Sequence, residues 1–319
     1  MIVLTWIIIL IISLLVLTRA SDWLSDSAEK IGLALGIPSF IVGVTIVSLG
    51  TSLPEIISSI FAVVEGSSEI VTANVFGSNI TNIFLILGLS AITARKLEIS
   101  YDLLHVDLPL FVGSAFYLGL ALLDAEFTLF EGIIGIAGSL IYLFYTISIR
   151  RNKESESIKE ELLDEHKSYH LDTKILLKII VSSALIFVSA KYTVESVIEL
   201  SKILEVGVEI VAILAVSFGT SLPELSVALN AARKGKSEIV VGSILGSSIF
   251  NSFAVLGISS MFGTIVIPST LLTFGLPVML AATILYFFIT QEKQITQWEG
   301  AMLLLFYAIF VQEVIRAAV

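Results

Sequence analysis

The sequence contains no cysteine and unusually few charged residues. Without cysteine the chain can form no disulfide, no thiolate metal site and no thiol nucleophile. Only 14% of its 319 residues are charged, against about a quarter in an average soluble domain, so it lacks the polar surface to face water on all sides. The formal net charge of −10 has the wrong sign for binding a phosphate backbone. These shortages exclude a soluble enzyme, a nucleic-acid-binding protein and a disordered scaffold.

Long apolar segments take the place of the missing charge. Hydrophobic residues make up 56% of the chain, and its mean hydropathy is +0.99. Because a helix needs about 20 apolar residues to cross a bilayer, we predict an all-α polytopic membrane protein. Ten spans are expected, at 2–18, 39–64, 70–94, 104–123, 128–149, 173–190, 208–232, 239–261, 272–290 and 297–315. The first and sixth should extend further as tilted helices, and Met1–Leu17, with no basic region before it, should be a retained helix.

Basic residues indicate the orientation of these spans. With the amino terminus outside, the outer ends carry little beyond Lys202 and Arg316. The inner ends carry Lys30, Arg95, Lys96, Arg150, Arg151, Lys153, Arg233, Lys234, Lys236 and Lys293. Since cytoplasmic loops are usually enriched in Lys and Arg, we expect a cell-membrane protein with both termini extracellular. The long polar stretch at 150–172 is then a solvated cytoplasmic linker.

An internal repeat divides the chain into two halves. The segment VSLGTSLPE at 47–55 recurs as VSFGTSLPE at 216–224, and GSNITN at 77–82 recurs as GSSIFN at 246–251, both with an offset of 169 residues. We assign 1–149 to a first five-helix repeat with its motif region at 43–92, and 173–319 to a second with its motif region at 212–261. Because five is odd, the second repeat should be inverted in the membrane. The equivalent loops EGSSE (65–69) and KGKSE (234–238) differ in charge, which agrees with opposite faces.

The first motif places a carboxylate within a span. On a helix, Ser48, Thr51, Ser52 and Glu55 share one face. A carboxylate at the centre of a membrane costs about 2.5–3.5 kcal/mol and is a functional candidate by default. The second copy offers Ser217, Thr220, Ser221 and Glu224 in the same pattern.

A proline next to each glutamate should break its helix. Pro54 and Pro223 remove a donor and clash with the carbonyls of Gly50 and Gly219, four residues earlier. Irregular backbone at this depth persists only where it lines a cavity, so freed carbonyl oxygens are expected beside the carboxylates.

The second motif adds Ser78 and Asn82, with Ser247 and Asn251 as their equivalents. Together the motifs offer carboxylates, amides, hydroxyls and carbonyls, all of them oxygen ligands. Such a set suits Ca²⁺ better than Mg²⁺, which dehydrates reluctantly, and softer metals prefer His and Cys. Two glutamates carry a charge of −2 that one Ca²⁺ or two Na⁺ would neutralise. Coupled exchange of these cations is therefore our hypothesis.

A simpler interpretation is that the motifs only pack helices together, since small residues allow close approach in membranes. We favour that interpretation for Gly77, Gly88, Gly246, Ser58 and Ser59. It does not explain paired glutamates within spans. For Asn82 and Asn251, hydrogen bonding between helices is an alternative to ligation.

The sequences GTSLPEI, GTSLPEL, GSNITN and GSSIFN resemble the α-repeats of the sodium/calcium exchanger family, in the cation/Ca²⁺ exchanger superfamily, and the short linker resembles its prokaryotic members. The resemblance implies no enzyme and no cofactor, but an antiporter that moves Ca²⁺ against Na⁺ by alternating access, with both ions bound only as transported substrates. A monomer would suffice, and helices 1 and 6 would slide across the core that holds the ions.

The resemblance also assigns the family's ion ligands to individual residues of this sequence. The resemblance places Ca²⁺ on Glu55 and Glu224, with the backbone oxygens of Thr51 and Thr220. It places the flanking Na⁺ sites on Ser48, Ser52, Ser78, Ser217, Ser221 and Ser247. Asn82 matches the family's Asn, whereas at Asn251 several members, including the K⁺-dependent branch, have Asp. Asn251 therefore makes K⁺ co-transport unexpected.

Two other functions stay open. A Ca²⁺/H⁺ antiporter of the same superfamily is chemically feasible because a buried Glu can titrate, although such relatives usually carry a Glu and a nearby His in the second motif. A non-transporting cation-binding membrane protein, such as a sensor, is the other, although no soluble output domain is visible in the sequence.

Overall fold

The computed structural model describes residues 2–34, 52–99, 107–153 and 173–317, and within these ranges helices dominate. The first half contains α1 (Ile2–Ala34), α4 (Leu53–Val64), α5 (Glu69–Ile80), the π-helical η2 (Thr81–Leu87), α6 (Gly88–Ala94), α8 (Asp107–Ala121) and α9 (Leu129–Lys153). The second contains α11 (Thr173–Leu204), α12 (Val208–Val211), π-helical η3 (Ala212–Val216), α13 (Ser217–Thr220), α14 (Leu222–Arg233), α15 (Ser237–Phe250), π-helical η4 (Asn251–Val255), α16 (Leu256–Ser259), 3₁₀-helical η5 (Ser260–Phe262), π-helical η6 (Leu271–Gly275), α17 (Leu276–Gln291) and α18 (Gln297–Ala317).

Several of these helices are long and apolar enough to cross a membrane. Among the described residues there are 7 such helices, or up to 8 if the bent pair Val208–Thr220 and Leu222–Arg233 forms one span. The expected spans 39–64 and 104–123 contain the shorter apolar helices Leu53–Val64 and Asp107–Ala121, while 39–51 and 104–106 lie outside the described residues. The prediction of a helical, multi-span membrane protein is confirmed.

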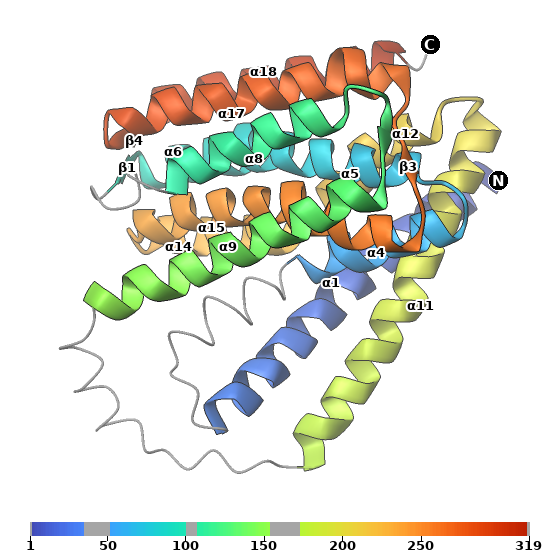
Figure 1. Cartoon of the computed structure of the whole chain (residues 1–319), viewed down its shortest axis with the longest axis horizontal. Coiled ribbons are helices and arrows are strands. Elements are labelled where there is room, and N and C mark those ends of the chain that lie inside the picture. The colour runs from blue at the N-terminus through green and yellow to red at the C-terminus, as the bar shows by residue number, and fades with distance from the viewer. Residues whose placement is uncertain (1, 35–51, 100–106, 154–172, 318–319) are drawn as a thin grey trace.

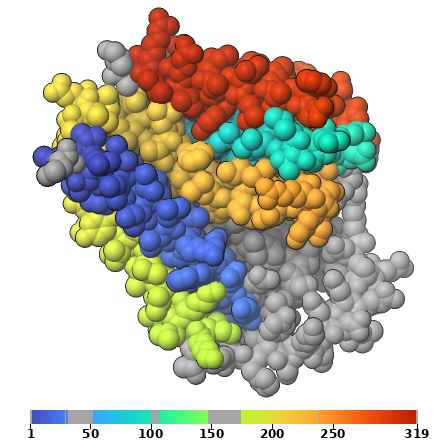
Figure 2. All heavy atoms as spheres, turned by 180° about the vertical axis from the view of Figure 1, so that it is seen from behind, coloured from blue at the N-terminus to red at the C-terminus, as the bar shows by residue number. Residues whose placement is uncertain are grey.

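The predicted extension of the first and sixth spans is also confirmed. Helices α1 and α11 have 33 and 32 residues, or about 50 Å at 1.5 Å per residue, well beyond the roughly 30 Å of hydrocarbon in a bilayer. The two pack against each other along their length. In Figures 1 and 2 they lie side by side and run steeply across the direction of α15, α17 and α18.

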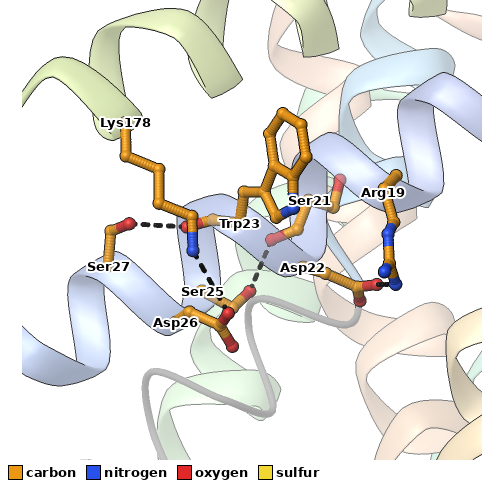
Figure 3. A network of polar contacts seen from close by, with 8 residues as sticks. All are labelled: Arg19, Ser21, Asp22, Trp23, Ser25, Asp26, Ser27 and Lys178. Atoms are coloured by element: carbon orange, nitrogen blue, oxygen red, sulfur yellow. Dashed lines mark hydrogen bonds and ion pairs between the residues drawn. The ribbon is translucent and has the colours of Figure 1, made fainter. Parts of the chain in front are cut away.

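Polar contacts join α1 to α11 near one end of the pair, as Figure 3 shows. The Lys178 ammonium lies 3.3 Å from the Asp26 carboxylate, while Arg19 and Asp22 pair within α1 at 3.7 Å. Further along the pair, Thr193 donates a hydrogen bond of 3.0 Å to the hydroxyl of Ser13. The long helices are thus joined by polar as well as apolar contacts.

Helix α5 lies at the centre of the protein. Every residue from Ile70 to Ile80 is buried, because η3, α4 and α17 are among the elements that pack around this helix. It continues without a break through η2 into α6, as α15 continues through η4 into α16. The widened π-turns η2 and η4 begin at nearly equivalent positions of the repeat, around Asn82 and at Asn251. Such π-turns frequently occur at functional sites.

Two short strand pairs connect the halves, and the sequence analysis did not predict them. Strand β1 (Lys96–Glu98) pairs antiparallel with β4 (Gln294–Thr296), and β2 (Glu126–Phe127) pairs with β3 (Ile265–Val266). Figure 1 places β1 and β4 at one end of the molecule and β3 at the other.

The helices after β2 and β4 start in the same way. Thr128 and Glu131 begin α9, with the Thr128 amide donating to the Glu131 carboxylate at 2.9 Å, and Thr296 and Glu299 repeat this before α18 at 2.7 Å. This T-x-x-E capping box fixes where each helix begins.

Candidate functional site

A break in the helix positions the second-half glutamate. Helix α13 ends at Thr220 and α14 begins at Leu222, with a bend of 44° between the two segments. Pro223 stands in the first turn of α14, so the predicted proline break is confirmed. The Gly219 carbonyl accepts a hydrogen bond of 3.4 Å from Thr18 of α1. In the first half α4 begins with Leu53 and Pro54, while Ser48, Gly50 and Thr51 lie outside the described residues.

The two glutamates are buried and close together. Glu55 is 1% exposed and Glu224 is 3% exposed. The two carboxylates interact electrostatically, and the Thr220 side chain lies near that of Glu55. Two negative charges held together in a dry interior repel each other, so both can be ionised only with a cation between them or beside them. The structure therefore brings together the pair on which the predicted cation site depends.

Residues from both halves surround Glu224. Ser247 of α15 donates a 3.2 Å hydrogen bond to Glu224 Oε1. Asn82, at the start of η2, donates to Ser247 Oγ at 3.4 Å. Helix α14 packs against η2, so the second motif of the first half lies against the first motif of the second half.

A second polar group joins α5 to α13. Ser78 Oγ lies 3.5 Å from the carbonyl oxygen of Ser217 and donates to Asn74 Oδ1 at 3.4 Å. Thr220 donates to the same Asn74 oxygen at 3.3 Å. All four side chains are fully buried. The close approach is possible because Gly77 has no Cβ, since one would meet Ser217 Cβ at 2.6 Å.

Many oxygens of the predicted ligand residues lack a hydrogen-bond partner among the described residues. These buried atoms are Ser52 Oγ, both carboxylate oxygens of Glu55, Asn82 Oδ1, Ser221 Oγ and Asn251 Oδ1. Unsatisfied buried polar atoms are uncommon and call for a bound ion or water. No cluster of three or more His, Cys, Asp or Glu side chains suited to a metal occurs in the described part of the chain. A cation here would thus be held by two carboxylates and neutral oxygens, a set suited to Ca²⁺ or Na⁺.

The sequence analysis missed two asparagines. Asn74 accepts hydrogen bonds from Ser78 and Thr220, and Asn79 bonds to Asn251. An amide within an apolar span is costly enough to indicate a role, and that signal was available at both positions.

The packing interpretation holds at two of the small residues. Gly77 lies against Ser217, and Gly88 lies against Gly300 of α18, where an added Cβ would be 2.9 Å from the Gly300 oxygen.

Close packing at Gly246 stays a prediction. Among the described residues the nearest atom, the Tyr142 hydroxyl, would be 3.4 Å from an added Cβ. The residues that correspond by the repeat to the neighbours of Gly77 are Val44 and Ser48, and both lie outside the described residues.

Comparison with known proteins identifies the family. The model of the sodium/calcium exchanger protein family matches residues 5–148 and 174–315, which is most of the chain. The chain belongs to the sodium/calcium exchanger family. It is not an enzyme family but a family of transporters, and the two matched blocks are separated at the predicted linker.

Individual members of the family match over nearly the whole chain. Sodium/calcium exchanger MaX1 of Methanosarcina acetivorans is 32% identical over 339 residues, covering 95% of this chain and 96% of MaX1. Inner membrane protein YrbG of Escherichia coli is 32% identical over 259 residues, 79% of this chain and 78% of YrbG. Among solved structures, the exchanger NCX_Mj soaked with 2.5 mM Na⁺ and 0.1 mM Ca²⁺ superposes with a TM-score of 0.66 at 25% identity, covering 98% of each chain.

Proposed function

We propose that this protein is a secondary active antiporter that exchanges Na⁺ for Ca²⁺ across the cell membrane by alternating access. The observation that carries the proposal is the buried pair Glu55 and Glu224, one from each half, whose carboxylates interact electrostatically. Membership of the sodium/calcium exchanger family supports it. Both ions are transported substrates.

The proposed ligands are those that the motifs supply. Ca²⁺ is held by Glu55 and Glu224 with the backbone oxygens of Thr51 and Thr220, and Asn82 and Asn251 add amide oxygens. Na⁺ binds at the flanking hydroxyls of Ser48, Ser52, Ser78, Ser217, Ser221 and Ser247. One Ca²⁺ or two Na⁺ neutralise the two glutamates. Because an empty ionised pair is costly in a dry interior, the site crosses between membrane faces more readily when loaded, and this couples the two fluxes.

The proposed architecture is ten spans in two inverted repeats, 1–149 and 173–319, joined by the linker 150–172. Two features support it. A shift of 169 residues carries β1 onto β3 and β2 onto β4, so the pairs β1–β4 and β2–β3 exchange places, and they lie at opposite ends of the molecule (Figure 1). The start of α1 and the end of α18 lie on the same side as β3, and the start of α11 lies at the bottom of the view, far from both (Figure 1). Together with the basic residues, this supports extracellular termini and a cytoplasmic linker.

The proposed moving part is the pair α1 and α11. Leu14 of α1 packs so closely on the broken helix that an added Cβ at Gly219 would lie 2.5 Å from it, and Thr18 donates to the Gly219 carbonyl. Sliding of α1 would therefore make and break contacts beside the freed backbone of the site.

Radioactive Ca²⁺ uptake into proteoliposomes tests the function. An imposed Na⁺ gradient should drive uptake and an imposed pH gradient should not; the reverse result would make the protein a Ca²⁺/H⁺ antiporter, and no uptake under either gradient would favour a non-transporting protein. Uptake should persist without K⁺ on either side.

Charge-neutral variants test the site. Glu55→Gln and Glu224→Gln should each abolish Na⁺-driven uptake, because one central charge is lost. Glu65→Gln is the matched control, since this glutamate lies exposed at the end of the helix that contains Glu55. Full activity of both site variants would remove the assignment.

A further inference from the structure

The amide of Asn79 lies next to the proposed ligands but is not one of them. Asn79 is 2% exposed on α5, directly after Ser78. Its Nδ2 lies 3.1 Å from the Ser252 hydroxyl and 3.6 Å from Met279 Sδ of α17. Its Oδ1 accepts a 3.2 Å hydrogen bond from Nδ2 of Asn251. One side chain thus connects three elements, α5, η4 and α17.

Met279 determines which way this amide faces. A thioether sulfur has lone pairs but no hydrogen, so it can only accept. The Ser252 hydroxyl can donate or accept, and it fits either orientation of Asn79. If the amide turned over, its oxygen would face the sulfur of Met279, and two acceptors would meet in a fully buried place. The sulfur therefore holds Nδ2 on its own side and Oδ1 toward Asn251.

The orientation of Asn79 sets the orientation of Asn251. Because the Asn79 Oδ1 that faces Asn251 is an acceptor, Asn251 has to donate the hydrogen bond from its Nδ2. Its Oδ1 is then directed away from Asn79, and it is buried without a hydrogen-bond partner among the described residues. The segment η4, which begins with Asn251, packs against α4, the helix that carries Glu55.

We propose that Asn79, held by Met279, is a positioning residue that turns the Asn251 oxygen toward the transported cation and selects against a carboxylate at position 251. This inference rests on the proposed function and deepens it. An Asp at 251 has two acceptor oxygens, and one of them would face Asn79 Oδ1 with no hydrogen between them. This repulsion between two oxygens could be removed only if Asn79 turned over, and its Oδ1 would then face the Met279 sulfur, which is also an acceptor. The cluster thus keeps position 251 neutral and leaves the site charge with the two glutamates.

A double-mutant cycle between positions 251 and 279 tests the selection. Leu in place of Met279 has a similar volume and no lone pair, so Asn79 can turn and donate to a carboxylate, while Ser252 donates to its oxygen. Asn251→Asp alone should lower Na⁺-driven Ca²⁺ uptake about tenfold, the equivalent of one lost charge-assisted hydrogen bond. In the double variant Asn251→Asp with Met279→Leu, Na⁺-driven Ca²⁺ uptake should lie within about threefold of that of Met279→Leu alone. The reason is that Asp at 251 is unfavourable only while the Met279 sulfur prevents Asn79 from turning. An equal loss in both backgrounds would overturn the selection by Met279.

A second variant tests the positioning. Asn79→Leu removes the acceptor for Asn251 and should raise the half-saturating Ca²⁺ concentration about tenfold, or about 1.4 kcal/mol, with the maximal rate changed less than about twofold. The control is Ser243→Ala, whose half-buried hydroxyl donates a 3.0 Å hydrogen bond to Val240 of its own helix, and it should behave as wild type. If Asn79→Leu lowers the maximal rate of uptake but leaves the half-saturating Ca²⁺ concentration unchanged, the role of Asn79 is purely structural and the proposal is overturned.

A measurement of Ca²⁺ binding in the absence of transport distinguishes failure of the proposed function from failure of the positioning role of Asn79. Ca²⁺ should raise the midpoint of thermal unfolding of the purified wild type, because a ligand that binds only the folded state stabilises it, and Asn79→Leu should reduce this rise. If wild type shows neither this rise nor uptake, the proposed function fails. If wild type exchanges ions and Asn79→Leu shows the full rise, the positioning role alone fails.

Discussion

Gly77 and Gly113 both lie within helices but have different surroundings. A Cβ on Gly77 would lie 2.5 Å from Ser217 Oγ and 2.7 Å from the backbone oxygen of Ile213. Gly113 of α8 is exposed, and no atom of the described residues would lie within 4 Å of a Cβ there. Alanine should therefore be accepted at position 113 and not at 77.

The size of the effect follows from these distances. For Gly77→Ala, the Ile213 oxygen has to retreat from 2.7 Å to the 3.4 Å at which ordinary contact begins. This is a backbone atom, so helices rather than a side chain must move. Overpacking of this kind costs roughly 1–3 kcal/mol, which the better helix propensity of alanine, about 1 kcal/mol, offsets only in part. The contact of 3.5 Å between Ser78 Oγ and Ser217 O, already at the limit of a hydrogen bond, would be lost.

Thermal unfolding and ion uptake of the two variants measure this difference. Gly77→Ala should lower the unfolding midpoint and reduce Na⁺-driven Ca²⁺ uptake about tenfold, the factor that corresponds to 1.4 kcal/mol. Gly113→Ala should unfold at or above the wild-type temperature, because it gains helix propensity without a clash. Equal behaviour of the two variants in both assays would refute the argument from close packing.

Three further predictions concern single contacts. Ser247→Ala removes a donor to Glu224, worth about 1.5–3 kcal/mol for a charged acceptor, and should raise the half-saturating Ca²⁺ concentration at least about tenfold; no change would place Ser247 outside the site. Lys178→Met breaks a partly exposed ion pair with Asp26 and should cost under about 1 kcal/mol of unfolding free energy, so a larger loss would mean that lipid dehydrates the pair. Glu299→Ala removes half of a capping box and should cost about 1 kcal/mol; an unchanged unfolding midpoint would contradict that role.

The sequence was sufficient for the membrane class and for the pair of glutamates. Apolar runs encode helices locally, and a carboxylate in a span is too costly to be left without a partner, so Glu55 and Glu224 could be expected to meet. The break at Pro223 follows from covalent geometry alone. The paired strands could not be predicted, because segments of two or three residues have no periodic pattern. Their partners, such as Leu97 and Ile295, are far apart in the sequence.

By itself, then, the sequence determined that two inverted copies of one motif should supply oxygen ligands for a cation, because repetition, spacing and the cost of buried charge are all properties of the chain. Only the tertiary structure decided which groups these residues meet. Gly77 lies against Ser217 and Ile213 of the other half, and Asn79 faces a sulfur that fixes the amide of Asn251. These contacts arise where segments distant in the sequence meet. Close packing and amide orientation depend on the atoms across such a contact, and the local sequence does not specify those atoms.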